Sequence, residues 1–75
     1  MLPVQCKMAR VALDLGVRDL AKLAQVAPAT VSRFEVGEEL KPRTIEAMQR
    51  ALESAGVEFT NGDQPGVRLK KAPRQ

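Results

Sequence analysis

The chain has 75 residues and a net charge of +3, with one cysteine, Cys6, and no histidine. A single cysteine excludes an internal disulfide, and the lack of histidine excludes the usual zinc ligand sets. No apolar run is long enough to span a membrane. We therefore expect a cytoplasmic single-domain protein without metal or other cofactor. Four basic residues lie in the last ten positions, which leaves residues 1–65 with eight basic against nine acidic residues, so net charge alone does not indicate nucleic-acid binding.

Four segments place apolar residues at spacings of three and four, which predicts four helices. We expect them from Pro3 to Leu15, from Val17 to Ala24, from Pro28 to a stop at Gly37, and from Pro42 to a stop at Gly56. Proline suits the first turn of a helix and glycine suits the residue that closes one, and Gly16 is the expected stop of the first helix. The apolar residues that mark these helices are Cys6, Ala9 and Leu13 with Val4 or Ala12, then Leu20, Ala21, Leu23, Ala24, Val31, Phe34, Ile45, Met48, Ala51, Leu52 and Ala55.

After the fourth helix the apolar residues alternate with polar ones, the pattern of strands with one buried face. Residues 57–60 and 67–70 show this alternation, and the segment 61–66 between them is rich in turn-forming residues. We therefore divide the chain into a helical domain at 1–56, a strand pair at 57–71 and a disordered tail at 72–75.

The second and third helices are joined by only three residues, Gln25-Val26-Ala27, so they must cross steeply. A close crossing requires a small residue, and Ala21 lies at that point. Val26, Val31 and Phe34 close the underside of the pair. The outer face of the third helix is then free, and an α-helix presented in this way fits the major groove of B-DNA, which is about 12 Å wide.

The residues of this motif, at 17–36, resemble the helix-turn-helix of the Cro and phage-repressor (XRE) family of transcription regulators. They are Ala21, Val26, Thr30-Val31, Phe34-Glu35 and Gly37, and the resemblance covers roughly residues 5–55. It implies a mainly α, four-helix, lambda-repressor-like DNA-binding domain, here with a short C-terminal strand pair. It also implies a homodimeric regulator, a repressor rather than an activator, that binds a palindromic operator in double-stranded DNA.

Candidate DNA contacts follow from the outward face of the third helix and from the resemblance. The resemblance implies that the loop at Lys41-Pro42-Arg43 touches the DNA backbone or minor groove, and that Arg10 forms a structural ion pair with Glu35. Arg18 begins the second helix, where backbone N–H groups also favour a phosphate. The expected DNA-binding residues are Arg18, Pro28, Ala29, Thr30, Ser32, Arg33, Lys41 and Arg43.

Each of these residues also has a structural interpretation. Arg33 and the other cations could be solvated helix residues, and Thr30 could stabilise the start of the third helix. Cys6 is expected to be a small core residue rather than a redox sensor. The basic tail could be a solvated end or a further DNA contact.

Two positions depart from the family pattern. Gln25 lies where the family has a glycine, in a position that takes left-handed backbone angles, which cost other residues roughly 1–2 kcal/mol. Ala27 lies where serine or threonine usually caps the third helix, a loss of about 1 kcal/mol. Pro28 and Ala29 offer few hydrogen-bonding groups, so direct readout of bases must depend on few side chains.

The strand pair is the expected dimer interface, because an isolated hairpin is marginally stable and its edges can pair with another chain. The residues expected there are Val57, Phe59, Val67 and Leu69. The alternative is a hairpin folded back on its own helices, with dimerisation through the fourth helix.

Residues for enzyme chemistry are not assembled in this sequence, so we expect no enzyme and no small-molecule ligand. Cys6 has no evident activating base, and the pair Glu38-Glu39 lies in an expected exposed loop. A competing function is a protein-interaction module, such as an antitoxin or anti-activator with a helix-turn-helix fold. A general architectural DNA protein would require more positive charge than residues 1–65 carry.

Overall fold

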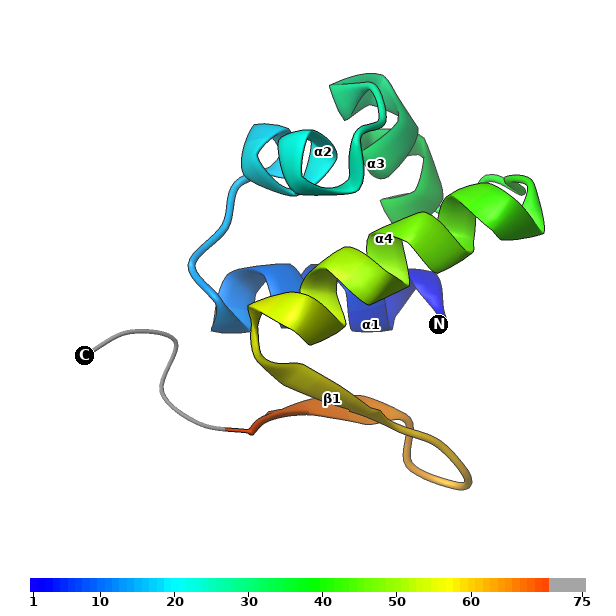
Figure 1. Cartoon of the computed structure of the whole chain (residues 1–75). Helices are drawn as coiled ribbons and strands as arrows, with labels where there is room; N and C mark the ends of the chain where they lie inside the picture. Colours follow the sequence, from blue (N-terminus) through cyan, green and yellow to red (C-terminus); the bar gives the residue numbers. More distant parts are fainter. Residues whose placement is uncertain (71–75) are drawn as a thin grey trace.

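A computed structural model describes residues 1–70, and within them it contains four helices followed by an antiparallel strand pair (Figure 1). The elements are α1 (Pro3–Ala12), α2 (Val17–Ala24), α3 (Pro28–Glu35), α4 (Pro42–Ala55), β1 (Val57–Thr60) and β2 (Gly66–Leu69). The expectation of a mainly helical chain with a C-terminal strand pair is confirmed. The expected tail at 72–75 lies outside the described residues.

The end of α1 differs from its prediction. The helix stops at Ala12 rather than Leu15 because Asp14 takes a left-handed backbone with φ of 61°. The amide of Leu15 then donates to the carbonyl of Arg10 at 2.8 Å, and the amide of Asp14 donates to that of Val11 at 3.0 Å. This is the hydrogen-bond pattern of a Schellman closure. Asp14, and not Gly16, therefore terminates α1.

Gly16 instead precedes α2 as its N-cap residue. Its amide donates to a carboxylate oxygen of Asp19 at 2.8 Å, which anchors the entry into the helix. A carboxylate in the first turn also lies near the positive end of the helix dipole. The pair fixes where the chain turns from α1 into α2.

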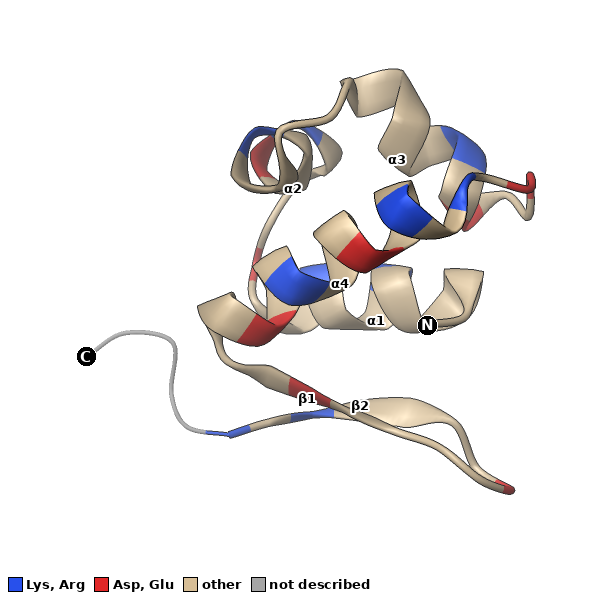
Figure 2. Ribbon diagram, turned by 45° about the vertical axis from the view of Figure 1, so that its right-hand side comes forward, with Lys and Arg blue, Asp and Glu red and all other residues tan. Residues whose placement is uncertain are grey.

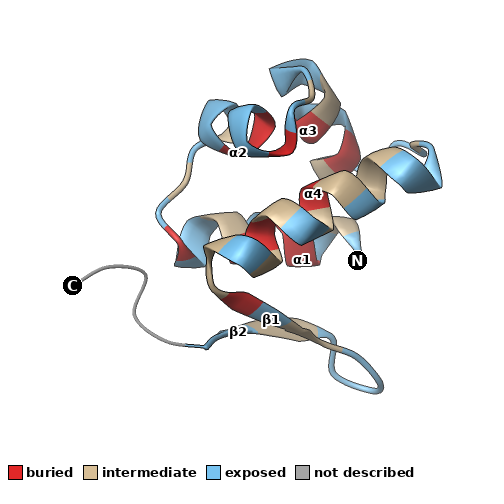
Figure 3. Ribbon diagram, viewed as in Figure 1, coloured by how far each residue is buried: buried red, intermediate tan, exposed pale blue. Residues whose placement is uncertain are grey.

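The core lies between α1, α2, α4 and the inner side of α3 (Figure 3). Val4 and Ala12, expected as alternatives in the buried stripe of α1, are both exposed, and Gln5 is buried in their place. Leu23 is also exposed. The buried hydrophobic residues are Cys6, Ala9, Leu13, Leu20, Ala21, Ala24, Val31, Phe34, Met48, Leu52 and Val57.

The strand pair packs against its own helices, with β2 beside α1 and β1 against the end of α4. The register pairs Val57 with Leu69 and Phe59 with Val67, so these four side chains share one face. The opposite face carries Glu58 and Arg68, which form an ion pair at 3.3 Å. One face of the hairpin therefore belongs to the core and the other faces solvent.

Gln5 joins α1 to this hairpin. Its side-chain nitrogen Nε2 donates to the carbonyls of Thr60 at 2.8 Å and Gly66 at 3.0 Å. Its oxygen Oε1 accepts from the amide of Leu2 at 2.8 Å. A buried amide is tolerated because its polar groups are paired. The result is a fixed position for the end of the strand pair next to its turn.

No helix within residues 1–70 is both long and apolar enough to span a membrane.

Candidate nucleic-acid interface

The segment from α2 to α3 presents one helix outward across another. The turn is closed by the amide of Val26, which donates to the carbonyl of Ala21 at 2.9 Å. Ala21 is buried at the crossing, and Val31 and Phe34 point into the core. Because the inner side of α3 is held in this way, its opposite side is left open to solvent.

Gln25 has φ of 61° and ψ of 45°. The expectation of a left-handed backbone at this position is therefore confirmed, although the residue is not glycine. Ala27 precedes α3 with an extended backbone and, being alanine, has no side-chain acceptor for the first amides of the helix. The amide of Thr30 donates to the carbonyl of Ala27 at 2.9 Å and compensates in part.

We predict that Gln25→Gly will raise the free energy of unfolding by about 0.5–1 kcal/mol, because relief of the left-handed strain outweighs the entropy cost of glycine. Urea denaturation measures the change. Gln49→Gly, inside α4, is the control and should lower stability by about 1 kcal/mol. A loss of stability in Gln25→Gly as large as in the control would contradict the claim that the left-handed backbone of Gln25 is strained.

Seven of the eight expected DNA-binding residues are exposed and the eighth, Thr30, is half-buried. Ser32 and Arg33 lie together on the outward side of α3, and Arg18 lies at the start of α2. Lys41 and Arg43 flank the first residue of α4, as expected for a basic loop. Figure 2 shows basic residues on α2, at the end of α3 and at the start of α4.

Lys22 is an exposed cation on α2 that the expected set omits. It lies four residues after Arg18, and residues at this spacing lie on the same side of a helix. The spacing of Lys22 from Arg18 could have identified it as a candidate DNA contact from the sequence. The two cations together extend the basic area along α2.

Acidic residues reduce the charge of this region. Glu38 and Glu39 are exposed in the loop that leads to Lys41. Glu35 is paired with the cation Arg10, whereas Asp19 is exposed and accepts a hydrogen bond from a backbone amide, which leaves its charge in place. Electrostatic repulsion of a polyanion in this region therefore comes from Glu38, Glu39 and Asp19.

The expected ion pair between Arg10 and Glu35 is present and joins α1 to the end of α3. Arg10 Nε and Nη2 each lie 2.9 Å from a different carboxylate oxygen of Glu35. Nη1 also donates to the carbonyl of Leu15 at 3.1 Å. The two side chains are only 14% and 10% exposed, so the pair is largely removed from water.

Cys6 completes this cluster. Its thiol lies 3.4 Å from Oε2 of Glu35 and donates to it. Burial, the negative charge of Glu35 and this hydrogen bond raise the pKa of Cys6 to about 12. The residue therefore remains a protonated thiol in the core, in agreement with the structural interpretation.

Most of the strand residues expected at a dimer interface pack instead against the core of their own chain. Val57 is fully buried within its own chain, and Phe59 and Val67 pack against the same core. Only Leu69 is substantially exposed. The expectation that Val57 faces a second copy is wrong, because its own chain already covers its surface. The hairpin folds back on its own helices, as in the alternative, and dimerisation through the fourth helix stays a prediction.

Among residues 1–70, no three His, Cys, Asp or Glu side chains gather closely enough to hold a metal ion. Comparison with known proteins found no protein-family model that matches this chain and no match among curated proteins.

Proposed function

We propose that this protein is a sequence-specific regulator of transcription that binds double-stranded DNA, with α3 as its recognition helix. The observation that carries the proposal is the outward side of α3, where Ser32 and Arg33 are exposed while Val31 and Phe34 anchor the opposite side. The resemblance of residues 5–55 to the XRE family of repressors supports the same function and favours repression of a palindromic operator by a homodimer.

The roles of the side chains follow from the groups they carry. Arg33 can pair with two acceptors of guanine, and the hydroxyl of Ser32 can reach either bases or phosphates. Pro28, Ala29 and the highly exposed Val36 provide apolar surface that suits a thymine methyl group. Sequence preference therefore depends strongly on Arg33.

The cations around α3 are suited to phosphates. Arg18 and Lys22 lie on α2, and Lys41 and Arg43 lie at the start of α4, so they flank the recognition helix. Phosphate contacts position a protein without reading sequence, and each makes binding weaker as salt rises. Contacts from these cations allow a body with little net charge to bind DNA.

The first test is selection of bound sites from random double-stranded DNA, followed by the variant Arg33→Ala. We expect Arg33→Ala to weaken binding to the selected site by about 1–3 kcal/mol, because it removes a base contact, while its melting temperature stays near that of the wild type. Titration of labelled DNA measures the affinity.

Arg50→Ala is the matched control, because Arg50 is an exposed cation on α4 that pairs with Glu46. It should bind the selected site as the wild type does. Equal affinities of Arg33→Ala and Arg50→Ala would remove Arg33 from the interface.

A protein-interaction module is the second candidate function. The observation in its favour is the exposed apolar side of α1, where Val4 and Val11 are open to solvent. Selection that enriches no DNA sequence would favour this function over the first.

A further inference from the structure

The turn of the hairpin contains the only asparagine of the chain, Asn61, and Gly62 follows it directly. The turn, residues 61–65, connects Thr60 and Gly66, which pair at the end of the two strands. Every residue of the turn is exposed. Asparagine is a chemically labile residue. A following glycine makes it most reactive, because glycine has no side chain to keep its backbone nitrogen away from the side-chain amide. The turn therefore presents a reactive pair of residues to water.

We propose that Asn61 is a modification site, at which the folded protein deamidates spontaneously to an isoaspartyl or aspartyl residue. The backbone nitrogen of Gly62 attacks Cγ of Asn61 and forms an N–Cγ bond. The bond from Cγ to Nδ2 breaks, and the side-chain nitrogen leaves as ammonia with the proton that the Gly62 nitrogen gives up. Water then opens the resulting succinimide ring, adding its hydroxyl to either ring carbonyl carbon and its proton to the nitrogen. The reaction consumes water alone and changes no oxidation state.

The structure leaves both reacting groups free. Apart from its chain neighbours, no heavy atom lies within 4 Å of the point that a Cβ of Gly62 would occupy, so the space beside the attacking residue is open. Within residues 1–70, no hydrogen bond engages the side-chain amide of Asn61 or the backbone amide of Gly62. The hydrogen bond inside the turn, from Oγ1 of Thr60 to the carbonyl of Gln64 at 3.4 Å, uses neither group. The reaction therefore requires no hydrogen bond of the fold to break.

The isoaspartyl product changes the length of the turn. When water attacks the ring at the former backbone carbonyl, the chain continues through Cβ and Cγ of residue 61, which adds a carbon to the backbone between Thr60 and Gly66. The carbonyls of these two residues are the acceptors of Gln5 Nε2, at 2.8 Å and 3.0 Å. A single nitrogen reaches both acceptors only while the turn keeps them close together. The modification should therefore weaken the attachment of the hairpin to Gln5.

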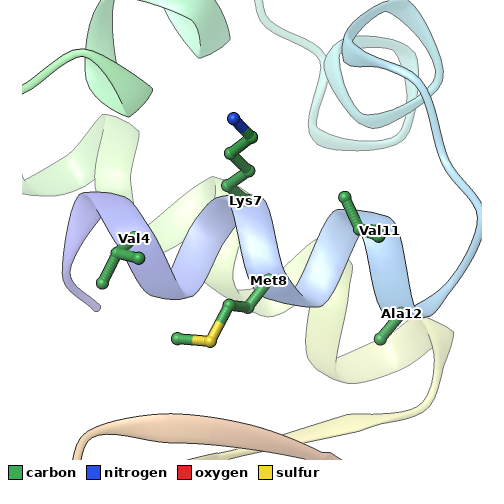
Figure 4. Close-up of a pocket in the computed structure, with 5 residues that line it drawn as sticks. All are labelled: Val4, Lys7, Met8, Val11 and Ala12. Atoms are coloured by element: carbon green, nitrogen blue, oxygen red, sulfur yellow. The ribbon is translucent and has the colours of Figure 1, made fainter.

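The effect should stay local to the strand pair. Apolar contacts with α1 do not depend on the turn, since β2 runs beside α1 and Met8 is directed from α1 toward the hairpin (Figure 4). The α2–α3 pair lies on the other side of α1 from the hairpin (Figure 1). The modification is therefore independent of the proposed DNA-binding function, and we expect it to loosen β1 and β2 while the helices stay folded.

The first test compares the folded protein with the same chain unfolded in guanidinium chloride, both incubated at mildly alkaline pH. Mass spectrometry follows the replacement of the side-chain NH2 by OH. Because the turn is already open, we expect the folded protein to react within about tenfold of the rate of the unfolded chain, a difference in activation free energy of no more than about 1.4 kcal/mol. The rate should rise with pH, since the nitrogen of Gly62 must lose its proton. Methyl transfer by an isoaspartyl methyltransferase identifies the isoaspartyl product.

Asn61→Gln is the matched control for the reaction. It keeps a side-chain amide in the same turn, but its longer side chain would have to close a larger and less favourable ring, so it should show no mass gain at position 61. Far-ultraviolet circular dichroism verifies that the incubated proteins are folded. A folded wild type that reacts more slowly than this tenfold limit, or a mass gain that persists in Asn61→Gln, would overturn the proposed site.

The second test measures the effect on the hairpin. The isoaspartyl form is purified from the incubated protein, and its amide hydrogen exchange is compared with that of Asn61→Asp, which has the same added negative charge but a backbone of normal length. We expect β1 and β2 to exchange faster in the isoaspartyl form and α4 to exchange equally in both, because local opening of the strands sets their exchange rates. Strands that exchange equally in the two proteins would overturn the link between residue 61 and Gln5.

Discussion

Arg10→Met is expected to lower the free energy of unfolding by about 3–5 kcal/mol, the cost of leaving one member of a buried ion pair without its partner. In the variant, the carboxylate of Glu35 remains at a site where its side chain is 10% exposed. The carbonyl of Leu15 also loses the hydrogen bond from Arg10. Urea denaturation at neutral pH measures the loss.

The double variant Arg10→Met with Glu35→Leu should recover part of this loss, because no charge is then left in the core. Glu46→Leu, which removes one partner of the exposed Arg50–Glu46 pair, is the control and should change stability by less than about 1 kcal/mol. A double variant no more stable than Arg10→Met alone would show that the unpaired charge of Glu35 does not cause the loss of stability.

The stability of this cluster should also depend on pH. Burial raises the pKa of Glu35, but the hydrogen bonds from Arg10 and Cys6 outweigh it and hold the pKa below its ordinary value of 4.5. A lowered folded-state pKa stabilises the protein fully above 4.5 and loses this contribution as the pH falls through the folded value. Without Arg10, burial raises the pKa of Glu35 in the variant, so the variant takes up a proton at a higher pH than the wild type. The difference in stability between the wild type and Arg10→Met should therefore be largest near neutral pH and shrink as the pH falls toward and below 4.5. A stability difference that stays constant as the pH falls would contradict the lowered pKa of Glu35 in the wild type.

Gln5→Leu is expected to cost about 2–4 kcal/mol, because it removes the partners of one backbone amide and two backbone carbonyls near the core. Leucine has a similar size and keeps the packing, so the loss reports mainly on the hydrogen bonds. Hydrogen exchange should become faster in β1 and β2 than in α4, since Gln5 fixes the hairpin to α1. Melting temperature and exchange rates provide the two measurements.

Gln64→Leu is the control for Gln5→Leu, because Gln64 is an exposed glutamine in the turn of the same hairpin. It should change stability by no more than about 0.5 kcal/mol. Equal effects of the two variants, or an unchanged exchange rate of the strands in Gln5→Leu, would show that the glutamine does not hold the hairpin.

The helices and strands could be predicted almost completely from local chemistry. The bounds of α2 agree with the prediction, and proline and glycine mark the ends of α4. The end of α1 was missed because a left-handed residue was expected to be glycine, and Asp14 occupies it instead. Short polar side chains can adopt this conformation, so the signal was present but weak.

The arrangement of the expected DNA-binding residues could also be predicted, because the three-residue turn between α2 and α3 decides which side of α3 faces out. Seven of the eight lie exposed, and Lys22 could have been added from its spacing to Arg18. Binding to DNA itself remains a prediction for the experiments above.

What the sequence determined by itself was the order of the elements and the side of each that is apolar, since both follow from periodicity and from residues that begin or end helices. Only the tertiary structure decided whether the apolar face of the hairpin and that of α1 are covered within the chain. The hairpin covers its apolar face with α1 and α4, where Gln5 supplies the buried hydrogen bonds, whereas Val4 and Val11 of α1 remain open. Periodicity cannot distinguish these outcomes, because an apolar face has the same pattern whether its own chain or another molecule covers it.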